Sequence, residues 1–144
     1  SVVCVAPVGF RGVTGMGLFR AITPAFAIPA LHLAARRFVV SIMLWIAWGR
    51  IGRPTAQDVD EYWAPTQFPD FTRALRHLLH AFTWNAPFPD LKVPRMTILG
   101  SRDHLSRARG EPDGGTVVVK DAGHALVEEV PEIVGAAMVK FFRE

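Results

Sequence analysis

The sequence has a single cysteine, Cys4, which lies inside the apolar run at residues 2–6. With one thiol, the chain can form no internal disulfide and no cysteine-rich metal site. We expect Cys4 to be an inert core residue, and a free thiol fits a reducing compartment such as the cytoplasm. No positively charged segment precedes the apolar run, so the N-terminus does not have the pattern of a secretory signal.

Clustered charge is also missing. The 144 residues include 16 Lys and Arg against 13 Asp and Glu, a net charge of +3, and the basic residues stand singly or in pairs. A surface that binds nucleic acid needs a concentrated basic patch, so we expect no nucleic-acid partner. Half of the residues are hydrophobic and 20% are charged. This composition excludes a disordered or purely solvating segment.

No hydrophobic run is long enough to cross a bilayer. The longest, residues 38–48, has eleven residues and follows Arg36 and Arg37, whereas a spanning helix needs about 20. We therefore expect no integral membrane association. A buried helix or a helix of a lid is the preferred interpretation of this run, and an interfacial membrane contact is the alternative.

Nucleotide and metal motifs are absent as well. The glycine-rich segment 8–17 lacks the Lys-Ser/Thr ending of a phosphate-binding loop and the spacing of a dinucleotide-binding motif. His77 and His80 are three residues apart and His32 lies upstream, but no HExxH pattern or carboxylate set accompanies them. The sequence therefore predicts no cofactor and no metal, with these histidines in surface or packing roles.

Three short apolar segments are predicted strands, at residues 2–6, 96–99 and 116–119. The first shows no alternation of apolar and polar residues, which is typical of a strand buried on both faces of a parallel sheet. Twelve residues, 104–115, separate Asp103 from the third strand. This is close to the minimum of about 10–12 residues for a right-handed crossover between parallel strands. The predicted fold class is α/β with three parallel strands.

A carboxylate and an imidazole follow two of these strands. Asp103 comes just after the second strand, and His124 lies in the turn after the third. Neighbouring parallel strands have their C-terminal ends at the same edge of a sheet, so we expect Asp103 beside His124. A carboxylate that accepts the Nδ1 proton fixes the tautomer of an imidazole and supports its charged form, as a general base requires. Singly, each residue is more often a cap, a turn former or a structural histidine; together they favour an acid–base pair.

Residues 16–90 have a helical pattern with no convincing strand. Residues 30–48 are helical in composition, Thr55 caps a short helix with Asp58 three residues on, and residues 69–84 form an amphipathic helix. A helical insertion between strands, over the edge where Asp103 and His124 emerge, is typical of a lid. The predicted organisation is a core strand at 1–10, a helical lid or cap at 11–90, and a C-terminal core segment at 91–144.

The C-terminal part of the chain resembles the α/β-hydrolase family. The residues that carry the resemblance are Leu91-Lys92-Val93-Pro94, Gly100-Ser101-Arg102-Asp103, Gly123-His124, Glu128-Glu129-Val130-Pro131-Glu132 and the closing helix to Phe141-Phe142. The resemblance covers about the last 54 residues strongly and residues 1–10 moderately. It implies that Asp103 is the acid and His124 the base of a catalytic triad. The enzyme would then hydrolyse an apolar ester, lactone or similar acyl substrate.

The family also commonly inserts a helical cap after the strand that corresponds to residues 1–6. Apolar side chains of the cap are therefore candidates to line a substrate pocket, and ordinary core packing is the alternative for each. The candidates are Phe10, Trp45, Trp48, Trp63 and Trp84, together with Met16, Phe19 and Phe68. The separation of Asp103 from His124 is 21 residues. This is shorter than is usual in the family, so the intervening helix is expected to be reduced to a turn.

The nucleophile of the family is not found in this chain. None of the serines stands in a G-x-S-x-G elbow, and no cysteine or aspartate takes that place; the serines are Ser1, Ser41, Ser101 and Ser106. In the family order of nucleophile, acid and histidine, the nucleophile would precede Ser1. We expect the chain to be the C-terminal half of a larger hydrolase. The N-terminal half would be a separate docked polypeptide or a segment that this sequence omits.

Other functions stay open. The resemblance would also allow epoxide opening, a reaction for which the family employs tyrosines of the lid. Tyr62 is the only tyrosine in this sequence. Dehalogenation would recruit a tryptophan for the halide, and both reactions need an aspartate nucleophile. The rival from another class is a non-catalytic binding module on a hydrolase scaffold, in which the acid and the base are idle.

Overall fold

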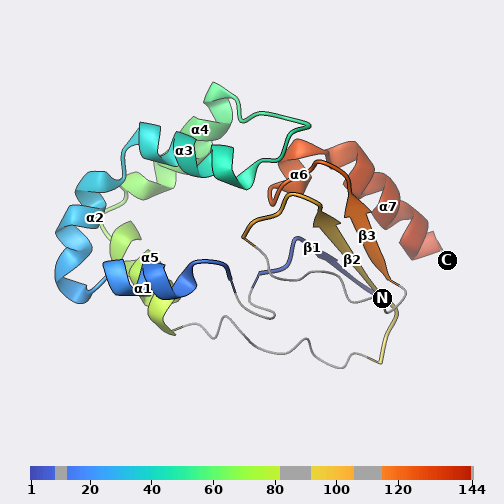
Figure 1. Cartoon of the computed structure of the whole chain (residues 1–144), viewed down its shortest axis with the longest axis horizontal. Coiled ribbons are helices and arrows are strands. Elements are labelled where there is room, and N and C mark those ends of the chain that lie inside the picture. The colour runs from blue at the N-terminus through green and yellow to red at the C-terminus, as the bar shows by residue number, and fades with distance from the viewer. Residues whose placement is uncertain (9–12, 82–91, 106–114, 144) are drawn as a thin grey trace. The chain divides into compact units, whose positions relative to one another are not determined.

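The computed structural model describes residues 1–8, 13–81, 92–105 and 115–143 (Figure 1). The elements follow in the order β1(Val2–Val5), α1(Met16–Ile22), η1(Ala25–Ala27), α2(Ile28–Ala34), α3(Arg37–Ala47), α4(Ala56–Trp63), η2(Ala64–Gln67), α5(Phe71–Ala81), β2(Arg95–Gly100), β3(Thr116–Val119), α6(Leu126–Glu129) and α7(Pro131–Arg143). They divide into a sheet unit, Ser1–Thr14, Ile46–Arg53 and Trp84–Glu144, and a helical unit, Gly15–Trp45 and Pro54–Thr83.

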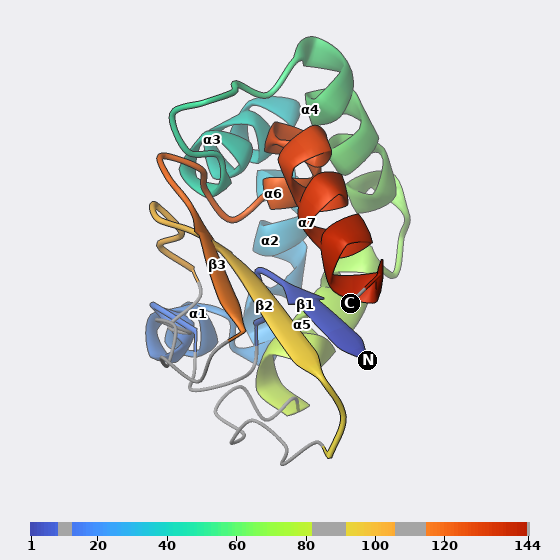
Figure 2. The same ribbon diagram turned by 90° about the vertical axis from the view of Figure 1, so that its right-hand side faces the viewer.

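The sheet unit contains one parallel sheet of three strands in the order β1-β2-β3, with β2 in the middle (Figure 2). Val3 pairs with Met96 on one side of β2, and Ile98 pairs with Val117 on the other. The prediction of an α/β fold with three parallel strands is confirmed. One detail differs, because all residues of β1 are only half-buried. The apolar run at residues 2–6 predicted burial on both faces, but in the described sheet β1 pairs with β2 alone.

The core of the sheet unit lies between one face of the sheet and the last two helices. Its buried residues are Ala6, Met96, Ile98, Val119, Ala122, Leu126, Val130 and Val134, and Ala137, Met138 and Phe141 pack against them. Ile98 has no exposed surface, and burying a side chain of this size stabilises a fold by about 1.5–3 kcal/mol. This packing fixes the central strand, and with it the turn that follows Gly100.

The helical unit differs from the sequence prediction at one point. The helix predicted over residues 30–48 is broken between α2 and α3, at Ala35 and Arg36. The Ala35 carbonyl oxygen accepts from Trp63 Nε1 at 3.3 Å and from Gln67 Nε2 at 3.4 Å. These side chains take the place of the next helical turn as hydrogen-bond donors, which explains why α2 ends here.

The predicted cap at Thr55 is confirmed. The Thr55 hydroxyl accepts from the Asp58 N–H at 3.2 Å, and the Asp58 carboxylate accepts from the Thr55 N–H at 2.6 Å. These reciprocal bonds form a capping box and lower the pKa of the Asp58 carboxyl, first through the backbone N–H of Thr55 and then through its side chain.

Among the described residues, no single helix is both long and apolar enough to cross a membrane. One pair of helices, Met16–Ile22 and Ala25–Ala34, has that length and composition when the two are counted together, but the chain is bent between them.

Candidate active site

Asp103 is held at the end of β2 by bonds to its own turn. Its N–H donates to the Gly100 carbonyl oxygen at 3.1 Å, and its Oδ1 accepts from the Leu105 N–H at 2.9 Å. An aspartate that accepts from the backbone two residues ahead closes an Asx turn, which is the local reason for this residue type here. The second carboxyl oxygen, Oδ2, takes no part in the bond to Leu105.

The turn after β3 carries His124. Asp121 adopts φ 61°, a left-handed conformation that Asp and Asn enter more readily than most residues. The His124 N–H then donates to the Ala47 carbonyl oxygen at 2.7 Å. Ala47 lies in the segment Ile46–Arg53, which belongs to the same sheet unit. The backbone of His124 is therefore held by a hydrogen bond to a residue that lies 77 positions earlier in the sequence.

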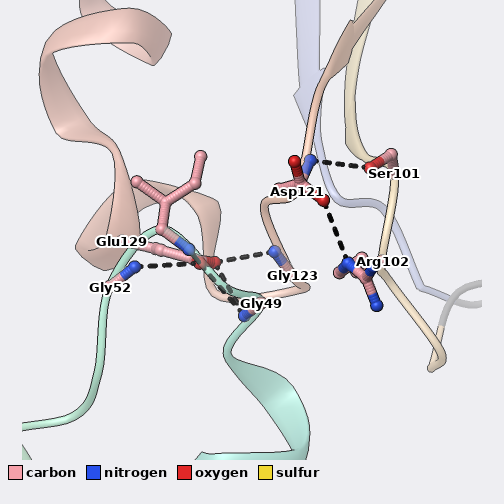
Figure 3. A network of polar contacts seen from close by, with 8 residues as sticks. Gly49, Gly52, Ser101, Arg102, Asp121, Gly123 and Glu129 are labelled. Carbon is pink, nitrogen blue, oxygen red and sulfur yellow. Dashed lines mark hydrogen bonds and ion pairs between the residues drawn. The ribbon is translucent and has the colours of Figure 1, made fainter.

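The turns after β2 and β3 are bonded to each other. The Ser101 N–H donates to the Val119 carbonyl oxygen and the Arg102 N–H to that of Ala122, both at 2.9 Å. Ser101 Oγ accepts from the Asp121 N–H at 2.8 Å, and Arg102 Nε pairs with Asp121 Oδ1 at 3.1 Å (Figure 3). These contacts set the separation of the two turns.

Asp103 and His124 meet at this edge of the sheet. His124 Nδ1 lies 2.9 Å from Asp103 Oδ2, and the Asp103 side chain is 4% exposed while that of His124 is 23% exposed. The contact expected from the strand order is therefore confirmed. Because a carboxylate accepts, the proton of a neutral imidazole belongs on Nδ1. Nε2 is then the nitrogen that can take a proton from another group, and the exposed fraction of His124 leaves the ring accessible.

Glu129, which belongs to the segment that resembles the α/β-hydrolase family, is a further residue of this region. It is 9% exposed, and its carboxylate accepts from backbone N–H groups of Gly123 and of the loop that follows α3. One signal in the sequence indicates its burial. Glu129 follows the apolar Leu126 by three residues, and Val130 follows it by four. This spacing places Glu129 on the apolar face of α6.

Gly123 lies where the backbone of the His124 turn passes very close to another segment. A Cβ at this position would collide with the Ala47 carbonyl oxygen and the Gly49 nitrogen. We expect Gly123→Ala to lower the free energy of unfolding by about 2–3 kcal/mol, because backbone atoms on the two segments would have to separate. Urea unfolding of the polypeptide that contains this chain measures the change.

Gly135→Ala is the matched control for that measurement. Gly135 lies inside α7, and a Cβ there meets nothing within 4 Å. Alanine in a helix interior is more stable than glycine by about 0.5–1 kcal/mol, so this variant is expected to be more stable than the wild type. Equal stability of the Gly123→Ala variant and the wild type would contradict the close approach of the two segments.

The predicted pocket residues are distributed over both units. Trp48, in the sheet unit, is 6% exposed, and Trp45, in the helical unit, is 49% exposed. Trp63 donates from Nε1 to the Ala35 carbonyl oxygen within the helical unit. Phe10 and Trp84 lie outside the described residues. The role of these side chains in substrate binding stays a prediction. So does the form of the crossover at 104–115, of which residues 106–114 lie outside the described residues.

Two histidines of the helical unit, His32 and His80, lie within hydrogen-bond distance of threonines. His80 Nε2 lies 3.0 Å from Thr23 Oγ1, and His32 Nδ1 lies 3.5 Å from Thr72 Oγ1. In the described part of the chain, no three His, Cys, Asp or Glu side chains are grouped so that they could hold a metal ion.

Comparison with family models and with curated proteins gives no match. Solved structures do match. The chain is similar to the 2-hydroxy-6-oxo-6-phenylhexa-2,4-dienoate hydrolase of Rhodococcus sp. strain RHA1, with a TM-score of 0.72 and 14% identity over 100% of this chain and 55% of that one. It is also similar to an α/β-hydrolase-fold protein of Burkholderia ambifaria, with a TM-score of 0.51 and 24% identity over 96% of this chain and 54% of that one.

These similarities show the fold. The three parallel strands and the helices form part of an α/β-hydrolase fold, and the resemblance to the C-terminal half of such a protein is confirmed at that level. The chain spans about half the length of the solved structures it matches. Proteins with a fold of this kind catalyse several different reactions, so the fold alone does not define the function, which depends on the residues of the site.

Proposed function

We propose that this chain supplies the acid and the base of a hydrolase that acts on an apolar ester, lactone or similar acyl substrate. The observation that carries the proposal is the 2.9 Å contact between His124 Nδ1 and Asp103 Oδ2, made at the C-terminal ends of neighbouring strands. The nucleophile, a serine in the simplest form, belongs to polypeptide outside these 144 residues. The absence of a G-x-S-x-G elbow from the sequence supports that assignment.

In the proposed reaction, His124 Nε2 takes the proton of the nucleophile hydroxyl as its oxygen attacks the acyl carbon. The imidazolium that forms is stabilised by the Asp103 carboxylate, whose 4% exposure limits screening by water. His124 then gives the proton to the leaving group, and an acyl-enzyme remains. Water then attacks the acyl-enzyme in the same way. His124 takes a proton from the water as its oxygen adds to the acyl carbon, and then gives that proton to the departing nucleophile, whose hydroxyl is re-formed.

The helical unit is proposed to act as the lid of this site. Trp45 and Trp63 of that unit, and Trp48 of the sheet unit, are proposed to be among the side chains that recognise an apolar substrate. The Rhodococcus neighbour is named for a substrate that carries a phenyl group and a keto group. The same name also includes a hydroxyl group and a carboxylate, so only the phenyl end of that substrate is apolar. We further propose that the partner is the N-terminal half of the hydrolase, docked as a separate chain or continuous with this one, and that the enzyme works in the cytoplasm.

Labelling with a fluorophosphonate, which reacts with activated serine hydroxyls, tests the proposal. In the polypeptide or complex that contains this chain, we expect one labelled serine outside the 144 residues. We expect the labelling rate to fall by at least about 10³-fold in the His124→Ala variant, because the hydroxyl is no longer deprotonated.

Two results would contradict the proposal: a label on Ser1, Ser41, Ser101 or Ser106, or labelling that is undiminished in His124→Ala. Complete lack of labelling in the wild type would favour a non-serine nucleophile or a binding module instead. Hydrolysis of a p-nitrophenyl ester by the same unlabelled preparation would then indicate a non-serine nucleophile rather than a binding module.

A further inference from the structure

The Glu129 carboxylate joins two segments that are far apart in the sequence. Oε2 accepts from the Gly123 N–H at 2.7 Å, and both oxygens accept from the Gly49 N–H at 3.1 Å. Oε1 also accepts from the N–H groups of Ile51 and Gly52 at 3.2 and 3.4 Å. Figure 3 shows the carboxylate between the loop that contains Gly49 and Gly52 and the turn that contains Gly123.

The same two segments are also bonded directly. The Arg50 N–H donates to the Asp121 carbonyl oxygen at 2.7 Å, and the Ala47 carbonyl oxygen accepts from the N–H groups of His124 and Ala125 at 2.7 and 3.4 Å. The peptide groups on both sides of Gly123 are thus held from two directions. Glu129 fixes the N–H of Gly123, and Ala47 fixes the N–H of His124.

A carboxylate is well suited to this place. Within the described residues, no Lys or Arg side chain forms an ion pair with Glu129, so backbone N–H dipoles balance the buried charge. Two oxygens can serve several converging donors, which one amide oxygen cannot. Loss of the carboxylate would leave donors at Gly49 and Gly123 without their acceptor.

We propose that Glu129 is the positioning residue of the base: it fixes the His124 turn against the loop at residues 49–52, and thereby the imidazole against Asp103. The expected loss in kcat rests on the proposed function, whereas the effect of Glu129 on the position of the His124 turn does not. A small displacement of a catalytic group slows the chemical step far more than substrate binding. The expected loss in kcat is about 10- to 100-fold, with little change in KM.

The test compares Glu129→Gln with Glu132→Gln in the polypeptide that contains this chain. Glutamine keeps the shape but turns one acceptor oxygen into a donor facing backbone N–H groups, whereas Glu132 is exposed at the start of α7. In Glu129→Gln we expect kcat for an apolar ester to fall about 10- to 100-fold and amide hydrogen exchange at Gly49 and Gly123 to speed up by about tenfold or more. The Glu132→Gln control is expected to match the wild type in both measurements.

The outcomes separate this inference from the proposed function. Faster exchange at Gly123 with kcat per labelled serine unchanged would mean that Glu129 only stabilises the fold, and would overturn the inference. Unchanged exchange would overturn it as well. If His124→Ala retained full activity, the proposed function would fail, while the exchange data would still test the structural link. Should Glu129→Gln not fold, Glu129→Asp keeps both oxygens on a shorter side chain and is expected to show smaller changes of the same kind.

Discussion

Replacing His124 with alanine is expected to reduce ester hydrolysis by the polypeptide that contains this chain by about 10⁴-fold or more in kcat. The reason is that His124 is the group proposed to take the proton of the nucleophile and return it to the leaving group. Such a loss corresponds to about 5.5 kcal/mol of transition-state stabilisation. Steady-state hydrolysis of a p-nitrophenyl ester with an apolar acyl group measures it.

His77→Ala is the matched control for this substitution. His77 is an exposed histidine of α5 in the helical unit, so its removal is expected to leave kcat within about twofold and the free energy of unfolding within about 0.5 kcal/mol. The catalytic assignment of His124 would be wrong if the two histidine variants hydrolysed the ester equally fast.

Replacing Asp103 with asparagine is expected to reduce kcat by about 10⁴-fold while the protein stays folded. Asparagine has nearly the same shape, but its amide carries no charge to stabilise an imidazolium and can present a donor to Nδ1. The wrong tautomer of His124 would then be favoured. The loss should appear in kcat much more than in KM, because Asp103 acts through the imidazole and the interaction strengthens only in the transition state.

Asp121→Asn provides the comparison for that variant. Asp121 lies in the neighbouring turn, its side chain is 40% exposed, and it pairs with Arg102 at 3.1 Å. Asparagine is tolerated at its positive φ, and an exposed ion pair contributes about 0–1 kcal/mol. We therefore expect Asp121→Asn to retain nearly full activity. Similar losses in both variants would indicate a general disturbance of the turns rather than a specific role for Asp103.

The edge of the sheet could be predicted from the sequence because its determinants are local. Apolar, β-branched residues define β2 and β3, and a glycine followed by polar residues marks the end of β2. The parallel order of two adjacent strands then places Asp103 beside His124. The cap at Thr55 was predictable for the same reason, because a capping box involves only four consecutive residues.

Other features depend on partners that are distant in the sequence. The break between α2 and α3 depends on donors from Trp63 and Gln67, which composition alone does not reveal. The half-buried state of β1 depends on which strands lie beside it. The burial of Glu129 was indicated by its place on the apolar face of α6, but its acceptor role requires the loop at residues 49–52 to fold back onto the Gly123 turn.

A double-mutant cycle of Asp103→Asn and His124→Ala, read out as kcat for ester hydrolysis, tests most directly whether the two residues act as one unit. If Asp103 acts through His124, adding Asp103→Asn to the His124→Ala variant lowers kcat by no more than about threefold. If Asp103→Asn instead causes the same further loss in that variant as it does in the wild type, the two residues act independently. The acid–base pair would then not be the basis of the activity.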